Sequence, residues 1–463
     1  NITYIKSTLL ASVYSVVKSA SVLPTSEEDK DLCENLNIAL DCLWDVMKVG
    51  LYQFQAGERA ALCNLGITQV GWDEDLVKGA GDSIVKGNVC FKNIDPLKFM
   101  RDPFATEFKY AGWCCTYDHY HKSILESNKN YKEAFKKYLE ENKDGDTTST
   151  LQVGPDNINP SNAKDYYTLI CYWVRDGDKI NEYHTLNNKV VLYKKEDIRP
   201  RAFPFALLYC NLPAGALIGT SEPAKIFANN LVYNLMDSIA CTAEYKNQQP
   251  PKFISDQSRL NIQAFAKHGD EANRTFVVSG DASKAVHYHQ FPQVSDFLST
   301  LKMSLAMDIQ NVSGVDQKYT GRDTGSIITT GGTEQMLARV TLIDTPKIVL
   351  YEEYCRTLTE LVLGNMVEFS PKRKFFRKKP DSTQYETIEV DFPKIDKDTL
   401  FNYRISISSE LPKNKQRIAA MATELLKAQA QYRTDGNSVN WITEEEWLMF
   451  QDLPMKEYML ERM

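Results

Sequence analysis

The chain has 463 residues, of which 43% are hydrophobic and 25% are charged, and its formal net charge is −7. This is the composition of a globular protein, with room for roughly two to four folding units. The acidic balance argues against a protein that wraps DNA tightly, because such proteins are basic over the binding face. The longest apolar stretch, residues 202–219, is interrupted by Pro204, Asn211 and Pro213, so it does not predict a membrane span.

The ten cysteines show no C-x-x-C spacing. We therefore expect a reducing compartment in which cysteine serves as a small apolar side chain. No signal peptide is recognisable from Asn1 onward.

The first 63 residues have the pattern of helices. Apolar residues recur at helical spacing over residues 2–22, and Pro24 ends that segment. A second helix is expected over residues 27–49, with Thr25 and Ser26 as its caps. A third helical segment continues to Cys63.

Short β-strands then alternate with turns. The segments expected as strands are 66–72, 83–85, 88–93, 166–175 and 190–193. Alternation through Trp113, Cys115 and Tyr117 predicts another strand, which leads into a charged helix over residues 123–142. Residues 143–163, rich in Asp, Gly, Ser, Thr and Asn, predict an exposed loop. This mixture places the chain in the α+β class.

Two amphipathic helices with a compact insertion between them are the most informative feature. The first covers residues 222–247, with Ser221 as its cap, and the second covers residues 293–313. The insertion, residues 252–292, contains two β-like runs at 275–279 and 285–291. The side chains expected to be buried are Ile226, Phe227, Leu231, Leu235, Met236 and Ile239 in the first helix, and Val294, Phe297, Leu298, Leu301, Leu305, Ile309 and Val312 in the second.

A Gly- and Thr-rich loop, residues 314–332, leads to a very long helix over residues 333–369. Pro346 lies inside that helix and should kink it, because proline removes one backbone hydrogen bond. Strands are expected at 384–390 and 401–408, followed by a helical region after Pro412. Thr443 and Glu446 have the spacing of a capping box for one more short helix.

This order of elements resembles the portal proteins of tailed bacteriophages, of the short-tailed phage type. The resemblance covers nearly the whole chain. It includes the local sequences of residues 87–103 (GNVCFKNIDPLKFMRDP) and of Ser313-Gly314-Val315. It implies a phage portal fold with an α/β wing, a two-helix stem, a small α/β clip, a long kinked helix and a short helical crown. The implied boundaries are 1–220 for the wing, 221–249 and 293–313 for the stem helices, 250–292 for the clip, 314–332 for the tunnel loop, 333–411 for the kinked helix and returning wing strands, and 412–463 for the crown.

The resemblance also implies a function. Portal proteins form a homo-oligomeric ring, a dodecamer, at one capsid vertex, and double-stranded DNA passes through it during packaging and ejection. The implied partners are the major capsid protein, the terminase and tail adaptor proteins, with no membrane. The implied location is the virion, after assembly in the host bacterial cytoplasm. No catalytic residue, cofactor or metal is expected.

Few charged residues lie on the two expected stem helices, which together contain three basic and five acidic residues. A strongly basic lining would hold DNA by its phosphates, so this balance favours passage. The candidates for contact with channel DNA are Lys302, Lys318 and Arg322. The alternative is that the two loop residues, Lys318 and Arg322, are merely solvated charges.

A second basic feature is the run KRKFFRKK at residues 372–379. One interpretation is a nucleic-acid patch. The other is a basic strand end that balances acidic neighbours. The candidate residues are Lys372, Arg373, Lys374, Arg377, Lys378 and Lys379.

Three other motifs point to metal or phosphate chemistry only weakly. The set Cys114, Cys115, His119 and His121 matches no common zinc spacing, and a strand sends adjacent cysteines to opposite faces. The pair at positions 287 and 289, both histidine, is expected to be part of a polar face of the insertion rather than a metal site or a pH sensor.

The third motif, the loop GRDTGSIITTGG at residues 321–332, lacks the Lys that a P-loop places on phosphates. Two rival functions remain open: another head-to-tail structural connector, and a nucleic-acid-processing enzyme.

Overall fold

A computed structural model shows the chain as two compact units. The first unit comprises Asn1–Glu222 and Ile327–Met463, and the second comprises Pro223–Ser326. The described residues are 6–7, 9–10, 13–16, 19–25, 27, 29–78, 85–141, 165–213, 216, 219–248, 252–268, 275–288, 296–313, 330–378, 385–396, 401–405, 419, 421–429, 442–443 and 446–448. Helices and strands are both abundant, and the expected α+β class is confirmed.

A three-stranded antiparallel sheet lies at the centre of the first unit. Its order is β3-β2-β9, with β2 at Leu65–Lys78, β3 at Val85–Ile94 and β9 at Phe205–Tyr209. Helices α3 (Val49–Cys63) and α9 (Thr330–Phe369) pack against it. One polar contact ties α9 to the sheet, because the hydroxyls of Thr68 and Tyr354 lie 2.7 Å apart in the buried interior.

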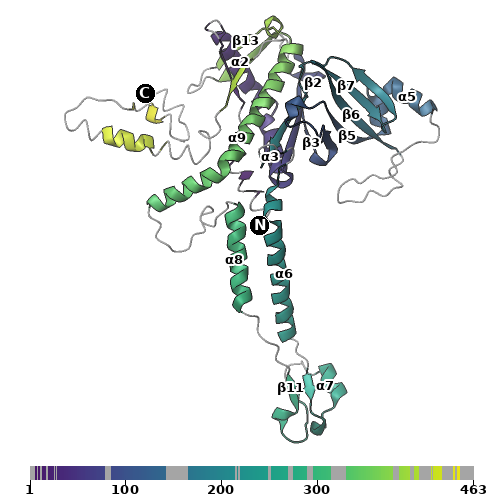
Figure 1. Ribbon diagram of the computed structural model, residues 1–463, viewed down its shortest axis with the longest axis vertical. Coiled ribbons are helices and arrows are strands. Elements are labelled where there is room, and N and C mark those ends of the chain that lie inside the picture. The colour runs from purple at the N-terminus through teal and green to yellow at the C-terminus, as the bar shows by residue number, and fades with distance from the viewer. Residues whose placement is uncertain are drawn as a thin grey trace. The chain divides into compact units, whose positions relative to one another are not determined.

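A five-stranded antiparallel sheet forms the other part of this unit (Figure 1). Its strands in order are β4 (Phe99–Arg101), β5 (Trp113–His121), β6 (Tyr166–Asp176), β7 (Lys179–Leu186) and β8 (Val190–Lys195). Asn187 and Asn188 both take positive φ, of 49° and 56°, which is the geometry of the tight turn between β7 and β8.

Two apolar clusters hold the five-stranded sheet in place. Toward one end of the sheet, Trp173 packs edge-on against Phe205 of β9, with ring centroids 4.8 Å apart. Toward the other end, Phe135 of α5 (Lys132–Glu141) and Leu125 of α4 (Lys122–Ser127) pack against Tyr167. Tyr167 and Trp173 lie an even number of positions apart on β6, so both clusters cover the same face of the sheet.

Three smaller pieces complete the first unit. Helix α2 (Lys30–Val46) contacts the hairpin of β12 (Arg373–Lys378) and β13 (Tyr385–Val390). Strand β1 (Ser21–Leu23) pairs with β14 (Asn402–Arg404). Near the C-terminus, Thr443 and Glu446 make the reciprocal bonds of the expected capping box: the Glu446 amide donates to Thr443 Oγ1 at 3.1 Å, and the Thr443 amide donates to Glu446 Oε2 at 2.9 Å.

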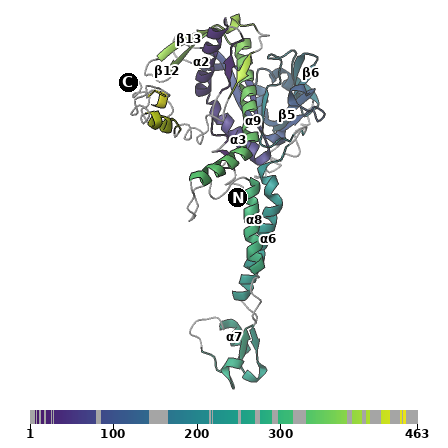
Figure 2. The ribbon, with the colours of Figure 1, turned by 60° about the vertical axis from the view of Figure 1, so that its left-hand side comes forward.

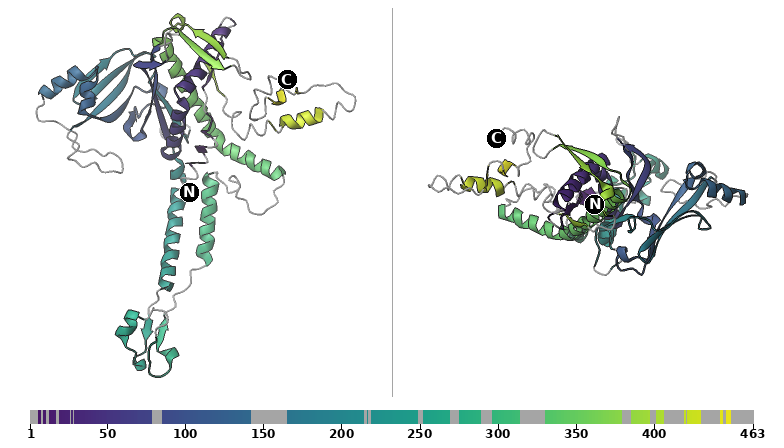
Figure 3. Two further views of the ribbon diagram at one scale, coloured as in Figure 1. Left: turned by 180° about the vertical axis from the view of Figure 1, so that it is seen from behind. Right: turned by 90° about the horizontal axis from the view of Figure 1, so that it is seen from above.

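The second unit is a pair of helices with a small terminal module. Helices α6 (Glu222–Gln248) and α8 (Asp296–Ser313) run side by side (Figures 2 and 3). The module contains α7 (Ile262–His268) and the antiparallel pair β10 (Lys252–Ile254) and β11 (Val286–Tyr288). Its core includes the edge-on contact of Phe265 with Phe276, whose ring centroids are 5.3 Å apart.

Most of the long helices lie where the sequence predicts them. Helices are confirmed at 222–248, 296–313 and 330–369, and Pro346 lies inside the last one. That helix, α9, changes direction along its length (Figure 1), as expected from an internal proline. The expected single helix over 27–49 is wrong, because Lys48 takes a left-handed φ of 53° and separates α2 from α3.

The strands were predicted less well. The expected strand at 88–93 lies within β3, which begins at Val85, and positions 83–84 lie outside the described residues. Strands β4, β7, β9 and β10 were not anticipated, and β12 was anticipated only as a basic strand end. Residues 275–279 form no strand; the Ser279 amide instead donates to the Ser258 carbonyl at 2.7 Å. Residues 21–22, expected to be helical, belong to β1. The expected loop at 143–163 and most of the region after Pro412 lie outside the described residues. Of the expected loop at 314–332, residues 314–329 also lie outside them, and residues 330–332 belong to α9 instead.

Candidate nucleic-acid interface

One face of α6 contacts α8. The Lys302 ammonium of α8 forms an ion pair with Asp237 and lies 5.1 Å from the centroid of the Tyr233 ring. Tyr233, Asp237 and Ala240 are partly covered and recur at helical spacing, so they mark the seam on α6. The seam on α8 consists of Leu298, Leu301, Leu305 and Ile309.

The largest apolar side chains of α6 point away from this seam. Phe227 is 66% exposed, Leu231 60%, Leu235 56% and Ile239 43%. They recur every four residues on the far side of the helix from Tyr233 and Asp237. We call these four residues the α6 stripe. The expectation that they are buried is wrong within one chain, although Ile226 is buried and Met236 is partly covered.

Helix α8 also carries apolar side chains on the face opposite its seam. Met303 is 67% exposed and Met307 is 62% exposed. Phe297 and Val312, expected to be buried, are exposed as well, and Val294 lies outside the described residues. Both helices therefore present an apolar outer flank, which in a soluble protein marks an interaction site.

Of the three residues predicted to contact channel DNA, the structure describes one. Lys302 is engaged within the second unit by Asp237 and Tyr233, so its charge is largely offset. Lys318 and Arg322 lie outside the described residues. Contact of these three residues with DNA stays a prediction.

Arg373 does not belong to a surface patch. Its side chain is buried, and its guanidinium donates to the Gly87 carbonyl at 2.6 Å and to Asn88 Oδ1 at 3.3 Å. It also lies over the ring of Trp72, 5.4 Å from the centroid. Burial lowers the pKa of Arg373 to about 10. This residue ties β12 to β3, which is a structural role.

The rest of the basic run is partly neutralised. The ammonium of Lys372 lies 3.0 Å from Glu389, and that of Lys374 lies 4.0 Å from the same carboxylate. Arg377 and Lys378 stand opposite Glu386 and Tyr385 in the β12–β13 register, and Lys379 lies outside the described residues. The pairings favour the interpretation of a basic strand that balances acidic neighbours.

No three metal-ligating side chains converge in the part of the chain that the structure describes. Cys114 and Cys115 are buried, while His119 bonds Thr168 and His121 caps α4 by accepting from the Ser123 amide. His287 lies on β11, and the neighbouring position 289 lies outside the described residues.

A buried charge cluster lies where α6 begins. The Lys347 ammonium is 3.3 Å from Glu222 Oε1 and 3.5 Å from Asp344 Oδ1, and both Lys347 and Glu222 are almost fully buried. The Asn211 amide donates to the same Glu222 oxygen at 2.8 Å. Lys347 directly follows Pro346, so the cluster fixes the first residue of α6 to the proline segment of α9. In the sequence, the sign of this charge cluster is a lysine that lies within an apolar stretch of α9.

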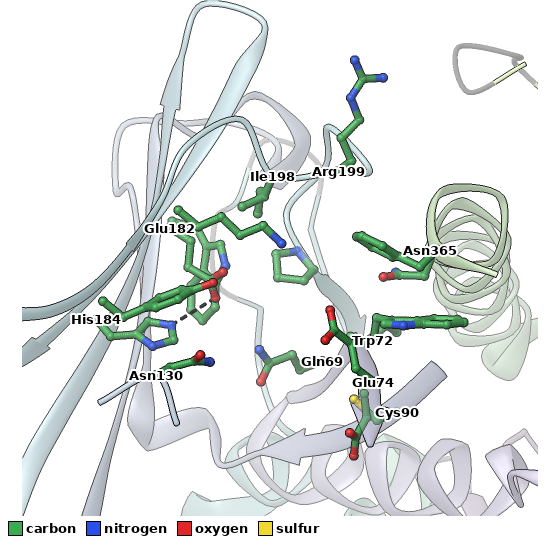
Figure 4. Close-up of a pocket in the computed structure, with 18 of the residues that line it drawn as sticks. Gln69, Trp72, Glu74, Cys90, Asn130, Glu182, His184, Ile198, Arg199 and Asn365 are labelled. Atoms are coloured by element: carbon green, nitrogen blue, oxygen red, sulfur yellow. Dashed lines mark hydrogen bonds and ion pairs between the residues drawn. The ribbon is translucent and has the colours of Figure 1, made fainter. Parts of the chain in front are cut away.

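Sequence reasoning also missed a polar cavity of about 770 Å³ between the two sheets and α9 (Figure 4). In its wall, His184 Nε2 lies 3.1 Å from Glu182 Oε1, and His184 Nδ1 lies 2.7 Å from the Tyr131 hydroxyl. A carboxylate only accepts, so Nε2 donates to Glu182, and in the neutral imidazole Nδ1 accepts from the Tyr131 hydroxyl. Both ring nitrogens are engaged, which favours an orienting role over proton transfer.

No protein-family model matches the chain, and comparison with curated protein sequences finds no match. Among the described helices, none has the length and apolar character needed to cross a bilayer. Function is therefore inferred from the geometry of the chain itself.

Replacing Lys347 with Ala should lower the free energy of unfolding by about 3–5 kcal/mol, because it leaves Glu222 buried without its counter-charge. Burial alone lowers the pKa of Lys347, but Glu222 and Asp344 outweigh it, and the pKa is raised. The stability that Lys347 contributes in the wild-type protein is therefore fully present below about pH 10.4, which is the pKa of a lysine in the unfolded chain. It is lost as the pH rises through the pKa of Lys347 in the folded protein. Urea unfolding at several pH values measures both effects. An unchanged midpoint for Lys347→Ala would contradict the role of the cluster.

Replacing Arg373 with Ala should cost about 2–3 kcal/mol, because two hydrogen bonds from a charged donor are lost. Lys374→Ala, the neighbouring exposed position, is the matched control and should leave stability unchanged. Urea unfolding followed by tryptophan fluorescence compares the two variants. Equal stability of both would show that Arg373 does not hold β12 to β3.

Proposed function

We propose that the chain is a phage portal protein: a subunit of a ring that conducts double-stranded DNA through a capsid vertex. The observation that carries this proposal is the α6 stripe, which lies exposed on a two-helix rod. Full burial of a Leu or Phe side chain contributes about 1.5–3 kcal/mol. Four such side chains in a row on one helix therefore favour association with a neighbour.

The two exposed flanks indicate how subunits associate. The α6 stripe and the Met303–Met307 pair each face away from the seam, so they lie on opposite flanks of the rod. A contact between the α6 stripe of one subunit and the α8 flank of the next joins unlike surfaces. Such head-to-tail contacts close into a ring when the rotation between subunits closes. A ring of parallel rods encloses a channel.

The charges of the rod suit passage of DNA. Helices α6 and α8 carry Lys225, Lys246 and Lys302 against five acidic residues. Three of these charges are already paired within the chain: Lys302 with Asp237, and Glu222 with Lys347 of α9. A lining without strong net positive charge releases few counterions from DNA and therefore does not hold it.

The remaining parts fit the same proposal. The helix pair serves as the stem, the module of α7, β10 and β11 as the clip, and the first unit as wing and crown, with α9 as the kinked helix. In this assignment the clip docks terminase and tail adaptor proteins, and the wing meets the major capsid protein. The ring is a dodecamer, and it belongs to the virion.

The double variant Leu231→Glu with Leu235→Glu should abolish ring assembly, because it places two charges within a buried subunit contact. We expect the wild-type protein to elute as a large oligomer and the variant as a monomer in size-exclusion chromatography with light scattering. Circular dichroism checks that the variant remains folded. The matched control is Val191→Glu, which changes an apolar side chain of similar exposure on β8 and should leave the oligomer intact. A monomeric wild type, or an oligomer that survives the double change, would refute the proposal.

A further inference from the structure

One face of the five-stranded sheet lies open to solvent. Both apolar clusters of this sheet contact the face of β6 that carries Tyr167 and Trp173. The strand register places six apolar or aromatic side chains of β4, β5 and β6 on the opposite face, which we call the open face: Met100, Trp113, Tyr117, Ile170, Tyr172 and Val174. Met100 is 51% exposed and Val174 36%, and the other four are only partly covered.

The sequence of β6 is that of a strand buried on both faces. From position 166 to 174 it reads YYTLICYWV, and Thr168 is its one residue that is neither apolar nor aromatic. A strand with one face in water alternates instead between apolar and polar side chains. The open face also bears no charged side chain, so its composition indicates that another surface covers it.

A second copy of the chain is the occupant that the proposed ring requires. A stable protein–protein interface uses roughly 20–30 residues on each side. The α6 stripe supplies four residues, and the apolar flank of α8 supplies few more. Neighbouring copies therefore need a further contact, and the first unit must provide it.

The first unit carries an exposed apolar patch on its helices as well. Val46, the last residue of α2, is 52% exposed, and Leu51 and Phe54 of α3 are 55% and 42% exposed. Leu51 and Phe54 are three positions apart and share one side of α3, while α3 packs against β2 and β3 of its own chain. We call these three residues the helix corner. A helix about 10 Å wide fits over two or three strands spaced ~4.8 Å apart.

We propose that the helix corner of one subunit packs on the open face of the next subunit. The proposal rests on the proposed ring and adds a second contact to it. The two surfaces are unlike, so this contact is head-to-tail, as is the contact between the α6 stripe and the α8 flank. The β7–β8 half of the same face is more polar, with Asn181, Thr185 and Lys194, so Val191 on β8 lies outside the contact.

Photo-crosslinking of the full-length protein tests this contact directly. A benzophenone amino acid in place of Met100 should crosslink to another copy, in a peptide that contains Leu51 and Phe54 and is identified by mass spectrometry. The same probe in place of Val191 is the matched control and should give at least tenfold less of this product. A crosslink from position 100 to the same sheet of another copy, or no crosslink between copies, overturns the proposal.

A charge substitution supplies an independent measurement. The double variant Leu51→Glu with Phe54→Glu should raise the protein concentration at which the oligomer dissociates at least tenfold, as measured by light scattering over a dilution series. Circular dichroism checks that the variant is folded, and Val191→Glu should leave the dissociation unchanged. Dissociation equal to that of the wild type overturns this contact and leaves the α6 stripe standing, whereas a monomeric wild type refutes both.

Discussion

The exposed α6 stripe is the constraint on which the arrangement of the second unit depends. A helix pair in water normally turns its largest apolar side chains toward the partner helix. Here α6 gives α8 a seam of Tyr233, Asp237 and Ala240, and leaves Phe227 and Leu231 outside. An exposed apolar flank of this kind marks an interaction site, and in our proposal the opposite flank of a second copy covers it.

The first residue of α6 belongs to the first unit and takes part in a buried charge cluster there. Glu222 is both the first residue of α6 and the partner of Lys347, which follows the proline of α9. Breaking a buried ion pair leaves an uncompensated charge in the interior, so the contact of Glu222 with Lys347 is costly to break. The start of α6 and the proline segment of α9 are therefore held together as one piece of the first unit.

Helical periodicity located the long helices, but it did not settle what covers them. The spacing of Leu231 and Leu235 identifies an apolar face, whereas only the structure shows that Lys302 draws Asp237 to the seam instead. Arg373 was grouped by composition with its basic neighbours, although strand alternation buries it beside Phe375. Arg59 lies on α3, more than thirty residues from Lys92 and Lys98, and no local pattern predicts that all three line one cavity, of about 470 Å³, in the first unit.

In the proposed assembly, the rods of several subunits stand around a shared hole. Electron microscopy of the purified full-length protein in negative stain tests it most directly. Class averages should show closed rings of about a dozen subunits with a stain-filled centre, as expected of head-to-tail contacts that close. Isolated particles of single-chain size, or compact dimers without a central hole, would contradict it.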